Sequence, residues 1–259
     1  MTPRVSGQLA LVTGASSGIG EAIARRLAGD GANLVLWARR EKRLTRLAEE
    51  IAAPGGVAVD IGVVDVRDRD AVRDEAERLI AARGAPDILV NNAGLAAGMA
   101  LVHDAEVDDW DRMIDTNVKG LLYVTRAFLP AMVERDSGQV VNIGSITGRQ
   151  VYPGASVYAA TKYAVQAITE GTNLDVLGTG VRVSGIHPGL VDTEFSLVRF
   201  KGDEDRARAV YKGLEPLTGA DVAEVVSYVV NAPPHVNLAD VVVFGESQGS
   251  VHHFHRDGG

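Results

Sequence analysis

The chain has 259 residues, of which 46% are hydrophobic and 23% charged, so a folded globular protein is expected rather than a disordered one. Its formal net charge of −8 argues against a protein that binds nucleic acid or an anionic membrane surface. The absence of cysteine excludes disulfides, thiolate metal sites and a cysteine nucleophile, and it is compatible with a reducing cytoplasm. The first apolar run ends at Gly14, too early for a signal-peptide core, and no window is long enough to span a membrane.

Short apolar segments rich in β-branched residues alternate with longer amphipathic segments along the chain. The predicted strands cover residues 9–13, 33–37, 139–145, 181–189 and 241–245. A further strand is predicted within 57–66, and residues 87–94 are predicted to be a strand that runs into a turn. The predicted helices cover residues 19–31, 41–53, 69–84, a long region of about 105–135, and about 156–177. Strands that are apolar on both faces are typical of parallel strands covered by helices. The pattern therefore predicts a single α/β domain over residues 1–259, with a Rossmann-type, doubly wound parallel sheet flanked by helices on both faces.

Residues 190–218 interrupt this alternation. The segment is polar, charged and irregular, and it follows the C-terminal end of a predicted strand. Ligands of open α/β sheets bind outside the C-terminal ends of the strands. We therefore expect a substrate-binding lid at about 190–218.

The sequence TGASSGIGEA follows the first predicted strand and opens the first predicted helix. Its glycines allow a tight turn, a close approach of the backbone to a pyrophosphate and close packing of the helix on the strand, while the helix N-terminus supplies N–H groups. A plain glycine-rich turn is the alternative, but the strand–turn–helix context favours a dinucleotide site. The expected cofactor contacts in this turn are Gly14, Ser16, Ser17, Gly18, Ile19 and Gly20.

The second predicted strand ends in Trp37-Ala38-Arg39-Arg40, with no carboxylate before Glu41. An acidic residue at this point would hydrogen-bond the ribose 2′-hydroxyl of NAD. Two guanidinium groups suit a 2′-phosphate instead, so NADP(H) is predicted in preference to NAD(H). The alternative is that both arginines are merely solvated at the start of a helix.

Tyr158 and Lys162 stand four residues apart in SVYAATKYAV, so they share one face of a predicted helix. Such a pair is common on protein surfaces, and it gains meaning only from other segments. The glycine turn, Asn92-Ala93-Gly94 with its preceding asparagine, Asn117, Ser145 and the tyrosine–lysine pair together resemble, in order and spacing, the short-chain dehydrogenase/reductase superfamily. The resemblance extends over essentially the whole chain.

A narrower resemblance lies in DDWDRMIDTNVKGLLYVTRAFLP, DTEFSLVRFKGD and PPHVNLADV. These segments are similar to the NADP-dependent 3-hydroxy acid dehydrogenases, a group that includes enzymes acting on serine and other small 3-hydroxy acids. Its close relatives reduce small anionic aldehydes such as malonic semialdehyde or sulfoacetaldehyde.

The resemblance implies a catalytic set of Asn117, Ser145, Tyr158 and Lys162. Tyr158 is implied to be the acid/base of hydride transfer. A free phenol has a pKa near ~10, and the ammonium of Lys162 is expected to lower it. Ser145 is implied to hold the substrate oxygen, and Asn117 to hold a water in a proton relay that includes Lys162. Taken alone, Ser145 would be a capping or turn residue and Asn117 an ordinary polar helix residue.

The resemblance also implies cofactor contacts beyond the glycine turn. They lie on the adenine side, after the fourth strand, on the catalytic helix and around the nicotinamide amide. The implied residues are Asp65, Val66, Asn92, Ala93, Gly94, Tyr158, Lys162, Pro188, Gly189, Val191 and Thr193.

A small acid substrate needs a cation beside Ser145, and three residues are candidates. Arg199 and Lys201 lie in the expected lid together with Phe195, and Arg149 follows Ser145 closely. Nearby acidic residues balance these cations, so a solvated, charged lid helix is the alternative for any one of them. In the C-terminal tail SVHHFHRDGG, three histidines have no carboxylate at metal-ligand spacing, so no metal is predicted and a subunit contact or a mobile end is favoured.

The sequence thus predicts an NADP(H)-dependent oxidoreductase that interconverts a small 3-hydroxy acid, such as serine or 3-hydroxypropionate, and its 3-oxo acid or semialdehyde. One alternative is an NADPH-dependent reductase of a larger ketone or aldehyde. Another is a non-catalytic NADP(H)-binding sensor or scaffold, against which the four intact catalytic residues argue. The expected partners are a small-molecule substrate and three further copies of the chain, with no nucleic acid or membrane. A cytoplasmic homotetramer is implied, formed through the helices of 105–135 and 156–177.

Overall fold

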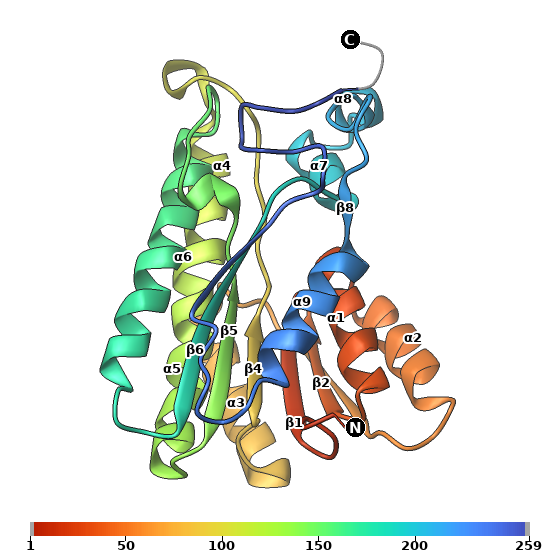
Figure 1. Ribbon diagram of the computed structural model, residues 1–259, viewed down its shortest axis with the longest axis vertical. Coiled ribbons are helices and arrows are strands. Elements are labelled where there is room, and N and C mark those ends of the chain that lie inside the picture. The colour runs from red at the N-terminus through yellow and green to blue at the C-terminus, as the bar shows by residue number, and fades with distance from the viewer. Residues whose placement is uncertain (1–2, 257–259) are drawn as a thin grey trace.

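A seven-stranded parallel sheet forms the centre of the molecule in this computed structural model, which describes residues 3–256 (Figure 1). The strand order is β3-β2-β1-β4-β5-β6-β9. Every neighbouring pair is parallel. The strands are β1 (Leu9–Thr13), β2 (Asn33–Ala38), β3 (Val59–Val63), β4 (Ile88–Asn91), β5 (Gly138–Ile143), β6 (Val181–Pro188) and β9 (Asp240–Val243). The strand order reverses between β1 and β4, and a crevice for ligands forms at such a point.

Helices cover both faces of the sheet. On one face lie α1 (Gly18–Gly29), α2 (Glu41–Ala52) and α9 (Gly219–Val230), whose apolar side chains share a core with β1, β2 and β4. On the other face α3 (Arg69–Arg83) and α5 (Leu121–Glu134) form a second core, and α6 (Ser156–Asp175) packs beside β6. Figure 1 shows the two layers on opposite sides of the sheet. Trp37 is buried in the second core, with its ring 5.5 Å from that of Phe128.

The long helical region predicted for 105–135 is divided into several parts. A 3₁₀ turn, η1 (Val102–Asp104), precedes α4 (Val107–Ile114), and a π-helical turn, η2 (Asp115–Gly120), joins α4 to α5. A π-helical turn widens the helix locally and is common at functional sites. It places Asn117 at the junction of two helical segments.

The segment 190–218 is more ordered than predicted. It contains β7 (Val191–Asp192), α7 (Glu194–Arg199), α8 (Glu204–Ala209) and β8 (Leu217–Thr218). The two short strands pair with each other in parallel and so close the segment at its base. The lid, as residues 190–218 are called below, lies beyond the C-terminal ends of the sheet strands (Figure 1).

The third strand lies within 57–66, as predicted, whereas α9 was not predicted. The α9 segment is rich in valine, a residue that favours strands, but a capping box between Thr218 and Asp221 starts a helix there. Within residues 3–256, no helix is long and apolar enough to cross a membrane. No group of histidine, aspartate and glutamate suited to a metal ion occurs in the same range. Residues 1–2 and the last three residues of the histidine-containing tail lie outside the described part of the chain.

Candidate active site

A cavity of about 520 Å³ lies at the C-terminal ends of the central strands, beneath the lid. Most of the residues predicted for the site line it. They are Gly14, Ser16, Ser17, Gly18, Ile19, Arg39, Arg40, Asp65, Val66, Asn92, Ala93, Gly94, Ser145, Tyr158, Lys162, Pro188, Gly189, Val191, Thr193, Phe195 and Arg199. The predicted residues outside its wall are Gly20, Asn117, Arg149 and Lys201. The fold thus brings the cofactor, catalytic and lid segments to one cavity.

The glycine turn is shaped by close backbone contacts. Gly14 and Gly18 have φ angles of +67° and +57°, which glycine adopts readily. A Cβ atom on Gly20 would lie 2.5 Å from the carbonyl oxygen of Gly14, so only glycine lets α1 pack on the turn. No side chain caps the start of α1 at Ser17, which leaves the first N–H groups of the helix for an anion. The turn therefore fits a pyrophosphate.

The turn after β4 is tied to the first strand. Thr13 Oγ1 accepts hydrogen bonds from the backbone N–H groups of Asn92 and Ala93, both at 3.0 Å. The side-chain amide of Asn92 donates to the carbonyl oxygen of Thr13 at 2.9 Å. These bonds hold the glycine turn and the turn after β4 next to each other in a fixed relation.

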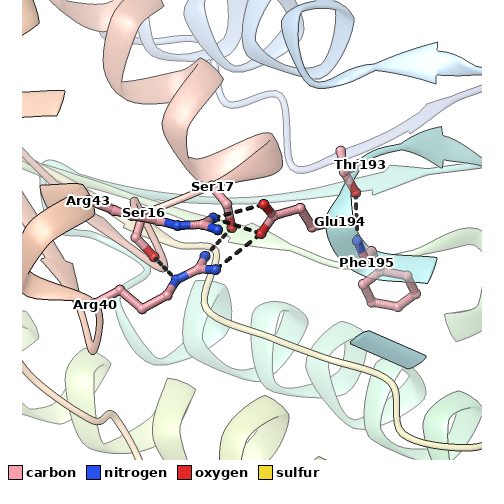
Figure 2. A network of polar contacts seen from close by, with 7 residues as sticks. All are labelled: Ser16, Ser17, Arg40, Arg43, Thr193, Glu194 and Phe195. Carbon is pink, nitrogen blue, oxygen red and sulfur yellow. Dashed lines mark hydrogen bonds and ion pairs between the residues drawn. The ribbon is translucent and has the colours of Figure 1, made fainter. Parts of the chain in front are cut away.

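The arginines after β2 differ in their contacts. Arg40 donates from Nε to Ser16 Oγ at 3.1 Å and from Nη2 to Ser17 Oγ at 2.5 Å, so it is bound to the glycine turn (Figure 2). Arg39 is largely exposed, and its Nη1 lies 3.9 Å from Asp65 Oδ2. A third cation, Arg43, lies in the first turn of α2, three residues after Arg40, and was not among the predicted site residues.

Tyr158 and Lys162 lie on α6, as predicted, and both are buried, with exposed fractions of 8% and 6%. Lys162 Nζ donates to the carbonyl oxygen of Ile143 at 2.9 Å, at the end of β5. Ser145 follows that strand and caps the 3₁₀ turn η3 (Ile146–Gly148) by accepting from the N–H of Thr147 at 3.1 Å. The end of β5 therefore positions both the lysine and the serine beside the tyrosine.

The predicted fall in the Tyr158 pKa is wrong for this arrangement. Burial raises the pKa of Tyr158 to about 12, and it outweighs the opposite effects of a hydrogen bond with Ser145 and the charge of Arg199. Burial also lowers the pKa of Lys162 to about 8. Both groups lie out of water, where the charged form of each is disfavoured. The hydrogen bond from the ammonium to the Ile143 carbonyl does not offset this loss of hydration. At neutral pH the protein therefore holds a neutral phenol.

Asn117 lies behind the cavity wall, in the π-helical turn. Its Oδ1 accepts from the N–H of Leu95 at 2.8 Å, and its Nδ2 donates to the carbonyl oxygen of Leu95 at 2.8 Å and to Thr161 Oγ1 at 3.0 Å. A Cβ atom on Gly94 would lie 3.3 Å from Asn117 Oδ1 and 3.7 Å from Lys162 Nζ. Asn117 thus connects the turn after β4 with the catalytic helix.

Two lid residues contact Tyr158 directly. The rings of Phe195 and Tyr158 are 5.6 Å apart, and the guanidinium carbon of Arg199 lies 5.7 Å from the centre of the Tyr158 ring. Arg199 is only 9% exposed, donates from Nη1 to the hydroxyl of Tyr152 at 2.6 Å, and has a buried Nη2 without a hydrogen-bond partner. Tyr152 was not predicted, because only the fold brings it to the lid.

The other two candidate cations lie elsewhere. Arg149 forms an ion pair with Asp240 at the start of β9, and His187 also contacts this carboxylate at 3.1 Å. Lys201 Nζ lies 2.8 Å from Asp109 Oδ2, at a neighbouring cavity of about 350 Å³. Of the three cations, Arg199 is the one that lines the larger cavity.

The C-terminal tail contributes to the larger cavity as well. Gln248, Val251, Phe254 and Arg256 line it, and Gln248 Oε1 accepts from the N–H of Leu190 at 2.8 Å, at the base of the lid. The sequence predicts a subunit contact or a mobile end for the tail and gives no sign of this contribution to the cavity. Its residue types carry no motif that points to a cavity wall.

A glycine turn at the switch point, two arginines after β2 and a buried tyrosine–lysine pair occur here in one cavity. The family model for short chain dehydrogenase matches residues 8–203. The chain belongs to the short-chain dehydrogenase family. The predictions of this family and of a Rossmann-type sheet are therefore confirmed.

Individual members of the family are similar over most of their length. The NADP-dependent 3-hydroxy acid dehydrogenase YdfG of Escherichia coli strain K12 is 48% identical over 231 residues, which cover 89% of this chain and 92% of that protein. Sulfoacetaldehyde reductase 2 of Chromohalobacter salexigens is 46% identical over 231 residues, covering 89% and 91%. The closed form of serine dehydrogenase complexed with NADP⁺ has a TM-score of 0.89 and 44% identity, covering 96% of this chain and all of that one. As a short-chain dehydrogenase, this protein is an oxidoreductase that acts on hydroxyl groups.

Proposed function

We propose that this short-chain dehydrogenase interconverts a small 3-hydroxy acid and its 3-oxo acid or semialdehyde, with NADP(H) as its cofactor. The observation that carries the substrate class is the buried guanidinium of Arg199 beside the ring of Tyr158. The relatives named above support the same assignment by their own activities and by the cofactor of the serine dehydrogenase structure.

The residues of the cavity fit NADP(H). The uncapped start of α1 and the glycine turn suit the pyrophosphate, while Arg39 and Arg40 would hold the 2′-phosphate together with the hydroxyls of Ser16 and Ser17. Lys162 and the turn after β4 would face the nicotinamide ribose. When bound, the cofactor supplies the hydride for reduction and accepts it in oxidation.

Tyr158 is suited to the proton step. Because its pKa is raised to about 12, its Oη carries a proton at neutral pH and can donate it to a carbonyl oxygen during reduction. In oxidation the same oxygen has to become an acceptor, and the charge of Arg199 together with the hydrogen bond from Ser145 favours the phenolate. The hydroxyl of Ser145 is placed to orient the substrate oxygen, since it forms a hydrogen bond with Tyr158. Asn117 joins the turn after β4 to Thr161, the residue before Lys162, and we assign it the proton relay expected from the family.

Arg199 gives the cavity its preference for an anion. Within residues 3–256, no acidic side chain forms an ion pair with it, and its Nη2 lacks a partner. A buried charge without a counterion is costly, so a carboxylate in the cavity would gain from the guanidinium. A guanidinium also matches a carboxylate through paired hydrogen bonds. A small hydroxy acid therefore fits this site better than a neutral alcohol does.

A second candidate is the reduction of a small aldehyde that carries a sulfonate, because the same cation would recognise either anion. The reduction of a larger neutral ketone leaves the Arg199 charge without use. A non-catalytic sensor has no need for Ser145, Tyr158 and Lys162 together in one cavity. We therefore adopt the interpretation that the protein is a dehydrogenase of small hydroxy acids.

The test follows absorbance at the reduced-nicotinamide band. Serine, 3-hydroxypropionate and 3-hydroxyisobutyrate are compared with their methyl esters, and each is offered with NADP⁺ or NAD⁺. We expect turnover of the acids with NADP⁺ and kcat/KM values for the esters at least about tenfold lower, since one charge pair is lost. Turnover of bulky neutral alcohols alone would move the function to a larger-ketone reductase. If none of these compounds is turned over although NADPH still binds, the protein would be a non-catalytic NADP(H)-binding sensor.

Assembly and location stay predictions. A homotetramer would use the apolar side chains that α5 and α6 leave exposed, among them Leu122 and Tyr163. A cytoplasmic location is what the family relationship and the lack of cysteine suggest.

A further inference from the structure

Glu194 places a carboxylate among the cations assigned to the cofactor (Figure 2). It is the first residue of the lid helix α7, whereas Arg40 and Arg43 stand at the start of α2. Glu194 Oε1 lies 2.8 Å from Arg43 Nη1, and Oε2 lies 3.1 Å from Arg40 Nη1. The hydrogen bonds from Arg43 and Arg40 hold the pKa of Glu194 below its usual range, so the carboxylate is charged at neutral pH.

The ion pairs of Glu194 with Arg40 and Arg43 are weak enough to be broken when another anion binds. The side chains of Arg40, Arg43 and Glu194 are 43%, 41% and 42% exposed, and ion pairs at such positions contribute little to stability. A 2′-phosphate needs the same guanidinium donors, and it carries more negative charge than a carboxylate. Two anions on one pair of guanidinium groups repel each other. The carboxylate and the phosphate therefore compete.

We propose that Glu194 is a specificity-determining residue that competes with the 2′-phosphate of NADP(H) for Arg40 and Arg43, so that cofactor binding releases the start of the lid helix. The inference rests on the proposed use of NADP(H). Arg43 thereby becomes part of the phosphate site, which the sequence predicts on Arg39 and Arg40 alone. NAD(H), which lacks this phosphate, leaves the contact of Glu194 with the arginines in place.

The release is transmitted over a short distance. α7 has six residues, with Glu194 at its start and Arg199 at its end. Phe195 follows Glu194 and packs on the ring of Tyr158, while its N–H donates to Thr193 Oγ1 at 3.2 Å (Figure 2). A change at Glu194 therefore alters the constraint on both residues that cover the catalytic tyrosine. The positions of Phe195 and Arg199 beside Tyr158 therefore depend on whether a 2′-phosphate is bound.

The test measures binding to the full chain by calorimetry. The probes are adenosine 2′,5′-bisphosphate, which carries the 2′-phosphate, and 5′-AMP, which does not. They are titrated into the parent protein, Glu194→Gln and the control Glu41→Gln. Glu41 is exposed, follows Arg40 directly and takes part in no ion pair among the described residues, so its variant removes the same charge without changing the contact.

We expect Glu194→Gln to tighten the bisphosphate by roughly three- to tenfold, the range for two solvent-accessible ion pairs, and to leave 5′-AMP unchanged. Glu41→Gln should change either Kd by less than about twofold. An unchanged or weaker bisphosphate affinity in Glu194→Gln would overturn the competition, as would an equal gain in Glu41→Gln. If the parent protein binds both probes equally, it is the NADP(H) preference that fails.

Hydrogen exchange of the lid gives a second readout. The bisphosphate should raise exchange in residues 193–200 of the parent protein, 5′-AMP should not, and Glu194→Gln should show the raised exchange without any ligand. Protection that stays equal in all of these states would overturn the release of the lid.

Discussion

The lid and the floor of the cavity are held by different kinds of interaction. The floor is formed by the ends of β1, β4 and β5, the turns that follow them, η2 and α6. In the floor, buried hydrogen bonds join neighbouring elements, such as those of Asn117 to Leu95 and of Lys162 to Ile143. The lid has half-exposed ion pairs as well, which join Glu194 to Arg40 and Arg43. Buried networks fix geometry, whereas exposed pairs are worth about 0–1 kcal/mol each.

The two kinds of interaction suit two different roles, proton transfer in the floor and substrate selection in the lid. The proton-transfer groups need positions that do not change between substrates, and the floor supplies them. The lid has to admit one molecule, cover it and let it go, so weaker contacts suit it. The following variants test whether chemistry resides in the floor and selection in the lid.

The largest effect is expected in the floor, from Tyr158→Phe. The change removes Oη but keeps the ring against Phe195, so kcat should fall by about 10³-fold while NADPH binding, followed by its fluorescence, is kept. Tyr228→Phe on α9 is the control, because its side chain is exposed and its loss of a hydroxyl should leave kcat unchanged. A Tyr158→Phe variant as fast as the parent would falsify the role of this tyrosine.

A smaller and more selective effect is expected in the lid, from Arg199→Gln. Without the buried guanidinium, kcat/KM for a small hydroxy acid should fall by about 10- to 100-fold, while that for its methyl ester should change little. Lys201→Gln, which alters an exposed lid cation paired with Asp109, should cost less than about threefold. Equal losses for acid and ester would mean that Arg199 serves the structure of the lid and not the recognition of a carboxylate.

The smallest effect is expected on the free energy of unfolding, when Lys162 in the floor is replaced by methionine. The pKa of Lys162 is about 8 in the folded protein against an ordinary value of 10.5, so the unfolded chain binds more protons between these values. The folded state of the parent therefore loses stability as the pH falls from 10.5 to 8, by up to about 3 kcal/mol, and no further below that.

The methionine variant escapes this loss, although it leaves the Ile143 carbonyl without its partner at a cost of about 1–3 kcal/mol. Urea unfolding should show the variant gaining on the parent by roughly 1–2 kcal/mol at pH 7, with the gain disappearing by about pH 10.5. A difference in unfolding free energy that does not vary with pH would show that the lysine carries no buried charge.

The sequence predicts the floor better than the lid, for a physical reason. Parallel strands need continuous apolar runs, and the glycine turn needs residues without side chains, so both are visible in a few adjacent letters. The lid helices are short, and α9 is rich in valine, so local preference does not identify them. The π-helical turn at Asn117 has no local signal either.

Partners from distant segments are the part that sequence reasoning could not supply. Glu194 meets Arg43 across 151 positions, and Arg149 meets Asp240 across 91. In each case the residue type indicates a charge, but only the fold decides which charge lies opposite. The same limit applies to the pKa of Tyr158, whose direction depends on burial, and burial is a property of the folded chain.

The two short strands β7 and β8 bring residues 191–192 and 217–218 together at the base of the lid. The chain therefore leaves the sheet domain and returns to it at a single point. A segment attached in this way can be lengthened, shortened or exchanged during evolution without moving the elements that carry the chemistry. Because β7 and β8 join the lid to the rest of the fold at one place, the lid can be replaced while the catalytic residues of the floor are kept. The same catalytic residues can then act on many different substrates.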